Sequence, residues 1–395
     1  MKLGDDFVEK ILRRISSNGF DARRDIDPDL FDITFKWLNE AVEKGFGSVE
    51  YGTDDAYFVH QIKYNNAVFA AFKAHREQNE LRAAMFDEDG KVRSFAQFRK
   101  AAEPIVAGYN ERWLQTEYDT AIIRAGHAAQ WRNREHERTL YPNLEWLAST
   151  SATPREGHKP FYGLVLPEVD PFWQSNYPGS LWGCKCGIRS TAAPVTPKKQ
   201  RSIALRSAPR PVPGLDENPA LSQAIFSISH PYYRHGAVPY RKLAPIIGKY
   251  ARNTMQRYTL QLTGEVRTAI DPYRGRTVVS HNLATGSAVF LRRTFKDVKT
   301  HNPDTRALLH ISNPDKAVTT WEYIGWKEVD VYPKGHKLAG QRKHPDAEYF
   351  TYYKTEIGGR THYVHVKYSK KTQTEIPYAI TDSLNMKGIN KNKPR

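Results

Sequence analysis

Two cysteines and a histidine stand close together in one stretch of the sequence, and these residue types could bind a metal ion. Cys184 and Cys186 are the only cysteines of the 395-residue chain, and His158 precedes them. Structural zinc normally takes four ligands, with thiolates separated by two to four residues. The Cys-x-Cys pair is tighter than that, and a fourth ligand would have to be Asp170 or another histidine. The spacing is compatible with structural zinc but does not favour it, so we expect no cofactor.

The same residues have two other interpretations. In the first, His158 and the tryptophans and prolines around it hold a loop-rich lobe together, and the cysteines pack as small apolar side chains. In the second, a cysteine and the histidine form a catalytic pair, but no third group at a recognisable spacing would orient the histidine. Cysteines this close do not make a disulfide framework, so we expect reduced thiols or metal ligands. The structural interpretation is favoured.

A second set of residues that could do chemistry lies near the C-terminal end, in a segment typical of β-strands. Runs rich in aromatic and β-branched residues fall within 321–383, and Gly358-Gly359 between two of them predicts a tight hairpin. Successive side chains of a strand point to opposite faces. Val364 and Val366 are therefore expected to face a core. The opposite face then presents Tyr363, His365 and Lys367.

This combination of side chains on an open sheet face favours RNA as a ligand. An aromatic ring can stack on a base, an ammonium group can hold a phosphate, and histidine can move a proton near neutral pH. In the last predicted strand, alternate side chains share one face as well. These are Ile376, Tyr378 and Ile380.

The charge is distributed unevenly between the two halves of the chain. Residues 1–190 contain 25 Lys and Arg against 28 Asp and Glu, a net charge of −3. Residues 191–395 contain the remaining 34 against 15, a net charge of +19. Such asymmetry indicates two functional parts, the second facing phosphate or an acidic surface. The sequence contains neither a membrane-spanning apolar run nor an export signal, so we expect a soluble chain with no membrane partner.

The elements that must position these residues follow from the apolar pattern. Apolar residues at helical spacing run from 27 to about 138, and short strands and turns are predicted over 144–189. The segment 191–214 contains five prolines and reads as an extended basic linker.

We therefore predict a multidomain chain. Its first domain, 1–190, is mainly α-helical with a small loop-rich β lobe. After the linker, an α+β domain at 215–395 carries an antiparallel sheet within about 321–383.

The first set of residues resembles the signature of the Mu F-like phage head morphogenesis proteins. The chain reads T-P-R-E-G-H, then D-P-F-W, then W-G-C-K-C, and the resemblance covers roughly residues 27–190. It implies a minor capsid protein with portal and capsid proteins as partners, located in the virion head or the bacterial host cytoplasm. We carry the family's positions over as structural ones, without a chemistry. They fall on Arg155, His158, Asp170, Trp173, Trp182, Cys184 and Cys186.

The C-terminal part resembles the barnase–EndoU–colicin–RelE-like nucleases, including the versions fused to phage head proteins, over roughly 240–385. The resemblance implies metal-independent RNA cleavage, with active groups on adjacent strands. It places the candidate catalytic groups at Lys354, His365, Lys367 and Thr381, with His336 and His344 as candidates for a second imidazole. The candidate nucleic-acid contacts are Tyr363, Tyr352, Lys337 and Arg342.

The mechanism we expect is transesterification by two histidines. One takes the proton of the 2′-OH, whose oxygen attacks phosphorus, and the second protonates the leaving 5′-oxygen, while a lysine stabilises the phosphorane. The function predicted is thus a phage minor head protein with a C-terminal, toxin-like endoribonuclease, for which an acidic immunity protein is an expected partner. The alternative is a non-catalytic virion protein whose basic half binds packaged DNA.

Overall fold

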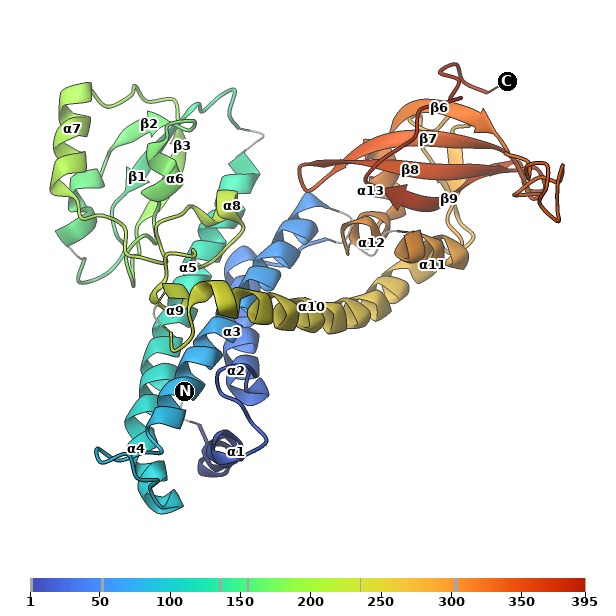
Figure 1. Cartoon of the computed structure of the whole chain (residues 1–395). Coiled ribbons are helices and arrows are strands. Elements are labelled where there is room, and N and C mark those ends of the chain that lie inside the picture. Colours follow the sequence, from blue (N-terminus) through green and yellow to red (C-terminus); the bar gives the residue numbers. More distant parts are fainter. Residues whose placement is uncertain are drawn as a thin grey trace. The chain divides into compact units, whose positions relative to one another are not determined.

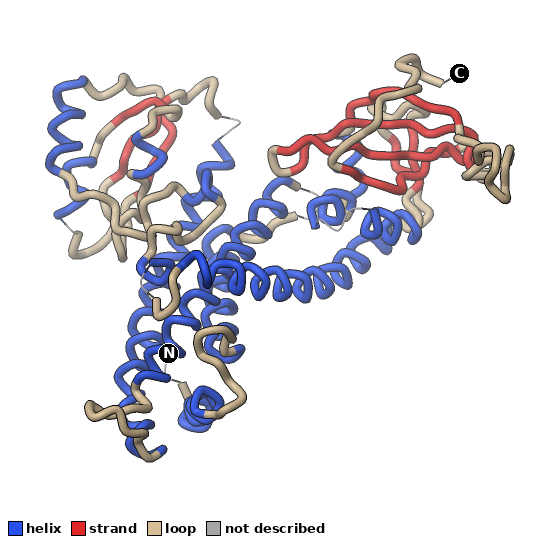
Figure 2. Tube along the Cα trace, viewed as in Figure 1, coloured by secondary structure: helices blue, strands red, loops and turns tan. Residues whose placement is uncertain are grey.

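The computed structural model forms two compact units. Unit 1 comprises Met1–Ser48 and Val59–Met255, and unit 2 comprises Val49–Phe58 and Gln256–Arg395. Both predicted classes of structure are present, helical in the first half and sheet-rich near the C-terminus (Figures 1 and 2). The described residues are 3–50, 53–134, 137–154, 156–234, 236–301 and 305–394. Arg155 of the predicted signature lies outside them.

Helices dominate the first part of the chain. Two of them, α2 and α5, pack so closely that a Cβ atom on Gly45 would lie 2.1 Å from the carbonyl oxygen of Ile122. Only glycine permits this approach. The helices are α1 (Asp5–Ser16), α2 (Pro28–Phe46), α3 (Asp54–Ala83), α4 (Phe95–Ala107) and α5 (Leu114–Asn133), with a π-helical turn over Gly108–Trp113 between the last two.

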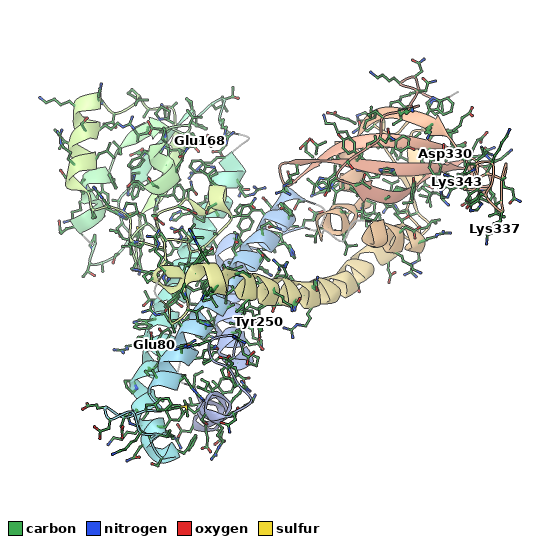
Figure 3. All side chains as sticks on the ribbon, viewed as in Figure 1. Glu80, Glu168, Tyr250, Asp330, Lys337 and Lys343 are labelled. Carbon is green, nitrogen blue, oxygen red and sulfur yellow. The ribbon has the colours of Figure 1, made fainter. Side chains whose placement is uncertain are left out.

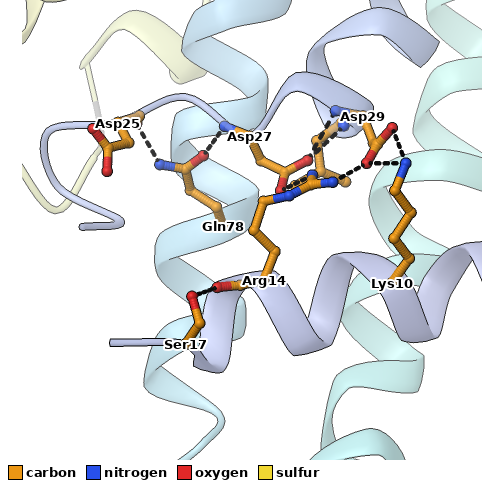
Figure 4. Close-up of polar contacts among 8 residues, drawn as sticks. Lys10, Arg14, Ser17, Asp25, Asp27, Asp29 and Gln78 are labelled. Carbon is orange, nitrogen blue, oxygen red and sulfur yellow. Dashed lines mark hydrogen bonds and ion pairs between the residues drawn. The ribbon is translucent and has the colours of Figure 1, made fainter. Parts of the chain in front are cut away.

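The start of α2 is fixed by a buried polar network (Figure 4). The carboxylate of Asp27 accepts hydrogen bonds from the backbone N–H groups of Asp29 and Leu30, both at 3.0 Å, which is a helix N-cap. Arg14 of α1 forms ion pairs with Asp27 at 2.7 Å and Asp29 at 2.6 Å. The Gln78 side chain of α3 accepts from the Asp27 N–H at 2.9 Å. Three helices are thereby joined at one capping site.

A small antiparallel sheet follows the helices and forms the predicted β lobe. Its strand order is β2-β1-β3, and Trp146, Phe161, Phe172 and Trp173 form the centre of its apolar core. Its elements are β1 (Asn143–Leu147), a 3₁₀ turn (Glu156–Phe161), β2 (Val165–Pro167), α6 (Phe172–Ser175) and β3 (Gly187–Thr191).

The segment 191–214 differs from the extended linker that its prolines predict. Helix α7 (Lys198–Ser207) occupies its middle, and Ala204 is buried in the lobe core. Arg201 pairs with Asp170 of the lobe at 2.8 Å. The prolines lie on either side of α7 and not within it, so they bound the helix without breaking it. Figure 1 shows α7 beside the lobe sheet.

The remaining helices lead from unit 1 into unit 2. In unit 2, the helical residues Val298, Leu308 and Leu309 share a core with strand residues and with Trp321 on one face of the sheet. The helices are α8 (Pro219–Ser222), α9 (Pro231–Arg234), α10 (Tyr240–Ile270), α11 (Arg292–His301), α12 (Thr305–Ile311) and α13 (Pro314–Ala317).

The sheet of unit 2 has six strands in the order β4-β5-β9-β8-β7-β6. All neighbouring pairs are antiparallel except β5 and β9, which are parallel. The strands are β4 (Thr277–Val279), β5 (Ser287–Val289), β6 (Glu322–Glu328), β7 (Ala347–Ile357), β8 (Arg360–Ser369) and β9 (Thr374–Thr381). The predicted segment 321–383 thus holds four of these strands.

The two faces of the sheet match the predicted alternation in β8 but not throughout β9. Val364 and Val366 are buried in the core shared with the helices, as expected. In β9, Ile380 lies in that same core, whereas Tyr378 packs on the opposite face against Phe350. A register shift in the β8–β9 pairing, opposite His365 and Val366, adds one residue to β9 and breaks the alternation. The expectation that Ile376, Tyr378 and Ile380 share a face is therefore wrong.

Among the described residues, none of the helices has the length and apolar character needed to cross a bilayer.

Candidate functional site

The lobe brings His158, Cys184 and Cys186 together. His158 lies in the 3₁₀ turn after β1, and the cysteines lie in the loop that leads into β3. The Nδ1 atom of His158 is 3.2 Å from the Sγ atom of Cys184 and 3.7 Å from that of Cys186. The three side chains are buried, and their ligand atoms all lie within 4.8 Å of one another. The structure thus forms a His/Cys/Cys triad that spacing alone did not favour.

The histidine of this triad is held from several sides. Its Nε2 atom is 3.3 Å from the hydroxyl of Ser180. The ring of Trp146 meets it edge to face, with ring centroids 5.1 Å apart, and Phe161 lies 6.0 Å away. Because Trp146 is fully buried, this side of the triad is closed to water. The imidazole therefore has a fixed orientation, with Nδ1 directed at the two sulfur atoms.

The other side of the triad borders a cavity of about 210 Å³. Hydroxyl groups and one ammonium group dominate the rest of its lining. The lining residues are Ser149, Ser151, Thr153, His158, Tyr162, Leu181, Gly183, Cys184, Lys185 and Cys186. The triad is thus buried on its aromatic side and reaches a polar pocket on the other.

The pKa values of the two thiols are shifted in opposite directions. A hydrogen bond from Cys186 lowers the pKa of the Cys184 thiol, and the hydrogen bond with His158 lowers it further, although burial acts in the opposite direction. The shared hydrogen bond raises the pKa of Cys186, as does its burial. One proton shared between two adjacent sulfur atoms explains this pattern. Of the two thiols, Cys184 is thus the one whose surroundings favour the thiolate.

The other signature residues support the lobe from outside the triad. Asp170, the suggested fourth ligand, accepts a hydrogen bond from the Phe172 N–H at 2.9 Å and pairs with Arg201. Trp173 is buried and donates its indole N–H to the Pro167 carbonyl at 3.0 Å. Trp182 is half-buried, with its ring 5.8 Å from that of Phe226. Their roles here are in packing and hydrogen bonding.

Sequence reasoning missed two side chains of α5 that hold the lobe. His127 is buried, and its Nε2 atom lies 3.1 Å from the Cys186 carbonyl oxygen. Arg124 is fully buried and donates to four carbonyl oxygens, at distances between 2.6 and 3.2 Å. Burial lowers the pKa of Arg124 to about 10. No local pattern signals these contacts, because the partners lie tens of residues away in the chain.

The sheet of unit 2 brings His365 and Thr381 together. The Nε2 atom of His365 in β8 is 2.8 Å from the hydroxyl of Thr381 in β9. The rings of Tyr352 and Tyr378 flank the imidazole, with centroids 5.3 Å and 6.0 Å away. His365 is half-buried on the face opposite the core that the helices share.

The candidate lysines of the sheet lie on this same face and have carboxylate partners. Lys354 is directly across from Tyr363 in the β7–β8 pairing and is 3.2 Å from Glu322. Lys367 forms an ion pair with Asp346. The hydrogen bond from Lys367 is the main reason that the pKa of Asp346 lies below its ordinary value. Both lysines thus lie on the same sheet face as His365, each with a carboxylate beside it.

The remaining candidates divide between the packed face and an exposed loop. Tyr352 is buried in an apolar cluster with Val329, Ala347 and Phe350, so it packs on this face and does not offer an open ring. His336, His344, Lys337 and Arg342 are exposed in the loop between β6 and β7. Figure 3 labels Lys337 in this loop.

The loop between β6 and β7 is held in place by hydrogen bonds. Backbone bonds from Tyr332 to Gln341 and from Lys343 to Asp330, both of 2.9 Å, join its two arms. His336 stacks on Tyr332 with ring centroids 4.4 Å apart, and His344 meets Phe350 at 5.2 Å. Each loop imidazole therefore has an aromatic partner of its own.

A carboxylate that sequence analysis did not single out lies inside unit 2. Glu375 of β9 is fully buried and accepts hydrogen bonds from the hydroxyls of Thr351 and Tyr353, both at 2.6 Å. Thr285 donates to it at 3.1 Å. Because Tyr353 belongs to the core that the helices share, Glu375 faces away from His365.

Part of the chain that includes most of the lobe is similar in sequence to known phage proteins. Residues 76–189 match the family described as Phage Mu protein F like protein. The Mu-like prophage FluMu F protein of Haemophilus influenzae is 30% identical over 79 residues, 20% of this chain and 19% of that protein. The putative capsid assembly protein F of Escherichia phage Mu is 29% identical over 82 residues, 21% of this chain and 19% of that protein.

The chain therefore spans about a fifth of the length of these curated relatives. No solved structure is a significant match to it. The family match ends at residue 189, before the C-terminal sheet begins. Residues 76–189, from the end of α3 through α4, α5 and most of the β lobe, are thus similar to the Phage Mu protein F-like family.

Proposed function

We propose that the chain is a phage head-assembly protein. The observation that carries the proposal is the family match over 76–189, which contains His158, Cys184 and Cys186. One relative of this region is named as a putative capsid assembly protein. Portal and capsid proteins are the partners that this role requires, in the virion head or in the host cytoplasm during assembly.

A test uses the phage or prophage that encodes the chain. Phage with Trp146→Ala in the lobe core should yield few filled heads, and the wild-type chain should be found in purified virions. Phage with His281→Ala, an exposed position in unit 2, serves as the matched control and should assemble normally. Two results together would refute the proposal. Purified wild-type virions would lack the chain, and phage from which the whole gene is deleted would still form normal heads.

We further propose that unit 2 cleaves RNA without a metal. The specific support is the hydrogen-bonded pair of His365 and Thr381 on a sheet face that also carries Lys354 and Lys367. In this mechanism His365 exchanges a proton with the 2′-OH or the leaving 5′-oxygen. The 2′-oxygen forms a bond to phosphorus as the bond to the 5′-oxygen breaks. His336 or His344, from the exposed loop, supplies the second imidazole.

Lys354 remains available to a phosphate despite its carboxylate partner. The Lys354 and Glu322 side chains are 43% and 72% exposed, so their pair is a surface one. Such surface ion pairs contribute at most about 1 kcal/mol to the stability of the fold, so little free energy is lost when a pair opens. An RNA phosphodiester accepts charge-assisted hydrogen bonds from such a lysine, and the phosphorane, which carries more negative charge, offers a stronger partner. Tyr363, half-buried opposite Lys354, is placed to stack on a base.

The nuclease proposal is tested with the full-length chain, RNA and a chelator in the buffer. Cleavage should persist in chelator, should be lost in His365→Ala and should be retained in His281→Ala. Intact RNA combined with salt-sensitive binding of duplex DNA would refute the nuclease and favour the packaged-DNA alternative. An active enzyme would also need a neutralising partner in its host, for which a small acidic immunity protein is suited.

A further inference from the structure

We propose that His158, Cys184 and Cys186 bind a zinc ion whose fourth ligand comes from the adjoining pocket and not from the protein. The proposal is independent of both functions proposed above. It assigns a metal to residues that the signature alone would leave as packing positions. The ligand set, two sulfur atoms and one imidazole nitrogen, suits zinc because zinc is borderline soft and accepts both donor types.

The nitrogen–sulfur distances in the triad are close to those that zinc requires. With Zn–S near 2.3 Å and Zn–N near 2.0 Å, tetrahedral geometry separates a sulfur and a nitrogen ligand by about 3.6 Å. The Nδ1 atom of His158 is 3.2 Å from one sulfur and 3.7 Å from the other. Side-chain shifts of a few tenths of an ångström would therefore complete the arrangement. Both sulfur atoms approach the same ring nitrogen, as two ligands of one ion must.

The surroundings of the imidazole are those of a metal ligand. A ligating histidine usually holds its second nitrogen in a hydrogen bond, which fixes the tautomer. The hydroxyl of Ser180, 3.3 Å from Nε2, can accept that N–H and leave the Nδ1 lone pair free for the ion. Trp146 and Phe161 then keep the ring from turning. His158 thus has both its direction and its tautomer set by neighbours.

The fourth position faces the cavity of about 210 Å³. Within the described part of the chain, the cluster of potential ligands contains only these three residues. Asp170 is engaged by Arg201 and is not part of that cluster. The cavity is large enough for water or a small anion, and hydroxyl groups line it. Three protein ligands and one exchangeable ligand are the arrangement of catalytic zinc sites, in contrast to the closed four-ligand structural sites.

Metal analysis of the full-length chain tests the proposal. The protein, purified without chelator and equilibrated with zinc, should contain one zinc ion per chain after gel filtration. Cys184→Ser, Cys186→Ser and His158→Gln should each reduce this content strongly. His127→Gln is the matched control, because His127 is a buried histidine beside Cys186 that contacts its carbonyl and not its sulfur. Zinc content well below one in the wild-type chain, or unchanged in the three variants, would overturn the proposal.

A second measurement needs no variant and so does not depend on mutant folding. The chain has only two cysteines, so every thiol signal reports on this site. In the folded wild-type chain, zinc should slow alkylation of both thiols at least tenfold, and chelator should restore the rapid rate. Equal rates with and without zinc would contradict metal binding.

Cobalt substitution tests the open fourth position. Cobalt should give the intense visible bands of a tetrahedral thiolate site, and added azide should shift them if the fourth ligand is exchangeable. Bands that azide leaves unchanged would show that the fourth ligand belongs to the protein and would overturn that part of the proposal.

Discussion

The β lobe and the C-terminal sheet each present a histidine to polar neighbours, but in opposite environments. In the lobe, His158 is buried, both ring nitrogens have neighbours, and aromatic rings close one side. On the sheet, His365 is half-buried beside Thr381, and the lysines of its face have exposed carboxylate partners. The lobe therefore holds its side chains in one fixed arrangement. The sheet face instead carries lysines that could exchange a carboxylate partner for a phosphate.

The largest expected effect lies in the lobe core. Trp146→Ala should lower the free energy of unfolding by about 3–5 kcal/mol, because it removes a fully buried ring that contacts His158 and the aromatic core. Tyr363→Ala on the sheet face should lower it by less than about 1 kcal/mol. Urea titration of the full-length chain measures both. Equal losses would show that the two regions do not differ in packing as described.

The stability of the protein should depend on pH through His310, a buried histidine of unit 2. Burial lowers the pKa of His310 to about 4, and the nearby His362 adds to this effect. The unfolded chain therefore binds the proton first as the pH falls below about 6.5, and stability is lost between pH 6.5 and 4. At pH 5 the loss from this group is about 2 kcal/mol.

His310→Gln isolates this contribution, because an amide oxygen can still accept the hydrogen bond that Trp321 donates at 3.0 Å. The difference in unfolding free energy between pH 7.5 and pH 5 should be smaller in the variant than in the wild type. An identical difference in both proteins would exclude His310 as the titrating group.

A smaller effect should test the orientation of His158. Ser180→Ala removes the hydroxyl beside Nε2 and should weaken zinc binding about tenfold, the lower end for residues that orient a metal ligand. Competition with a chelating dye of known affinity measures this change. Ser149→Ala, a hydroxyl of the pocket lining, is the control and should leave the affinity nearly unchanged. A similar loss in both variants would point to general disturbance of the lobe.

The smallest effect on stability is expected from the sheet face. Glu322→Gln breaks the pair with Lys354, yet it should change the unfolding free energy by less than about 1 kcal/mol, because both side chains are exposed. The same change should strengthen RNA binding at low salt, since it removes a negative charge beside a phosphate-binding lysine. Weaker RNA binding in this variant would show that the pair orders Lys354 for its ligand.

The predictable parts of the fold are those that local rules determine. Strand alternation placed Val364 and Val366 in the core and His365 on the other face. The Gly358-Gly359 hairpin also follows from local geometry, since both glycines have positive φ, at 57° and 71°. The helical first half and the small β lobe were predicted from apolar spacing.

The features that were predicted wrongly or missed depend on contacts between residues far apart in the sequence, or on irregular pairing of strands. The extra residue in β9 reversed the face of Ile380, and no sequence pattern marks such a bulge. The triad forms because a 3₁₀ turn and a loop 26 residues later meet at one point, which the spacing of Cys184 and Cys186 does not reveal. The contacts of Arg124 and the packing of α7 on the lobe arise in the same way.

X-ray absorption at the zinc edge of the zinc-loaded full-length chain tests the central claim about the lobe most directly. The predicted first shell contains two sulfur atoms at about 2.3 Å and two nitrogen or oxygen atoms at about 2.0 Å, one from His158 and one from a non-protein ligand. A shell with four sulfur atoms, or with none, would contradict the site proposed for His158, Cys184 and Cys186.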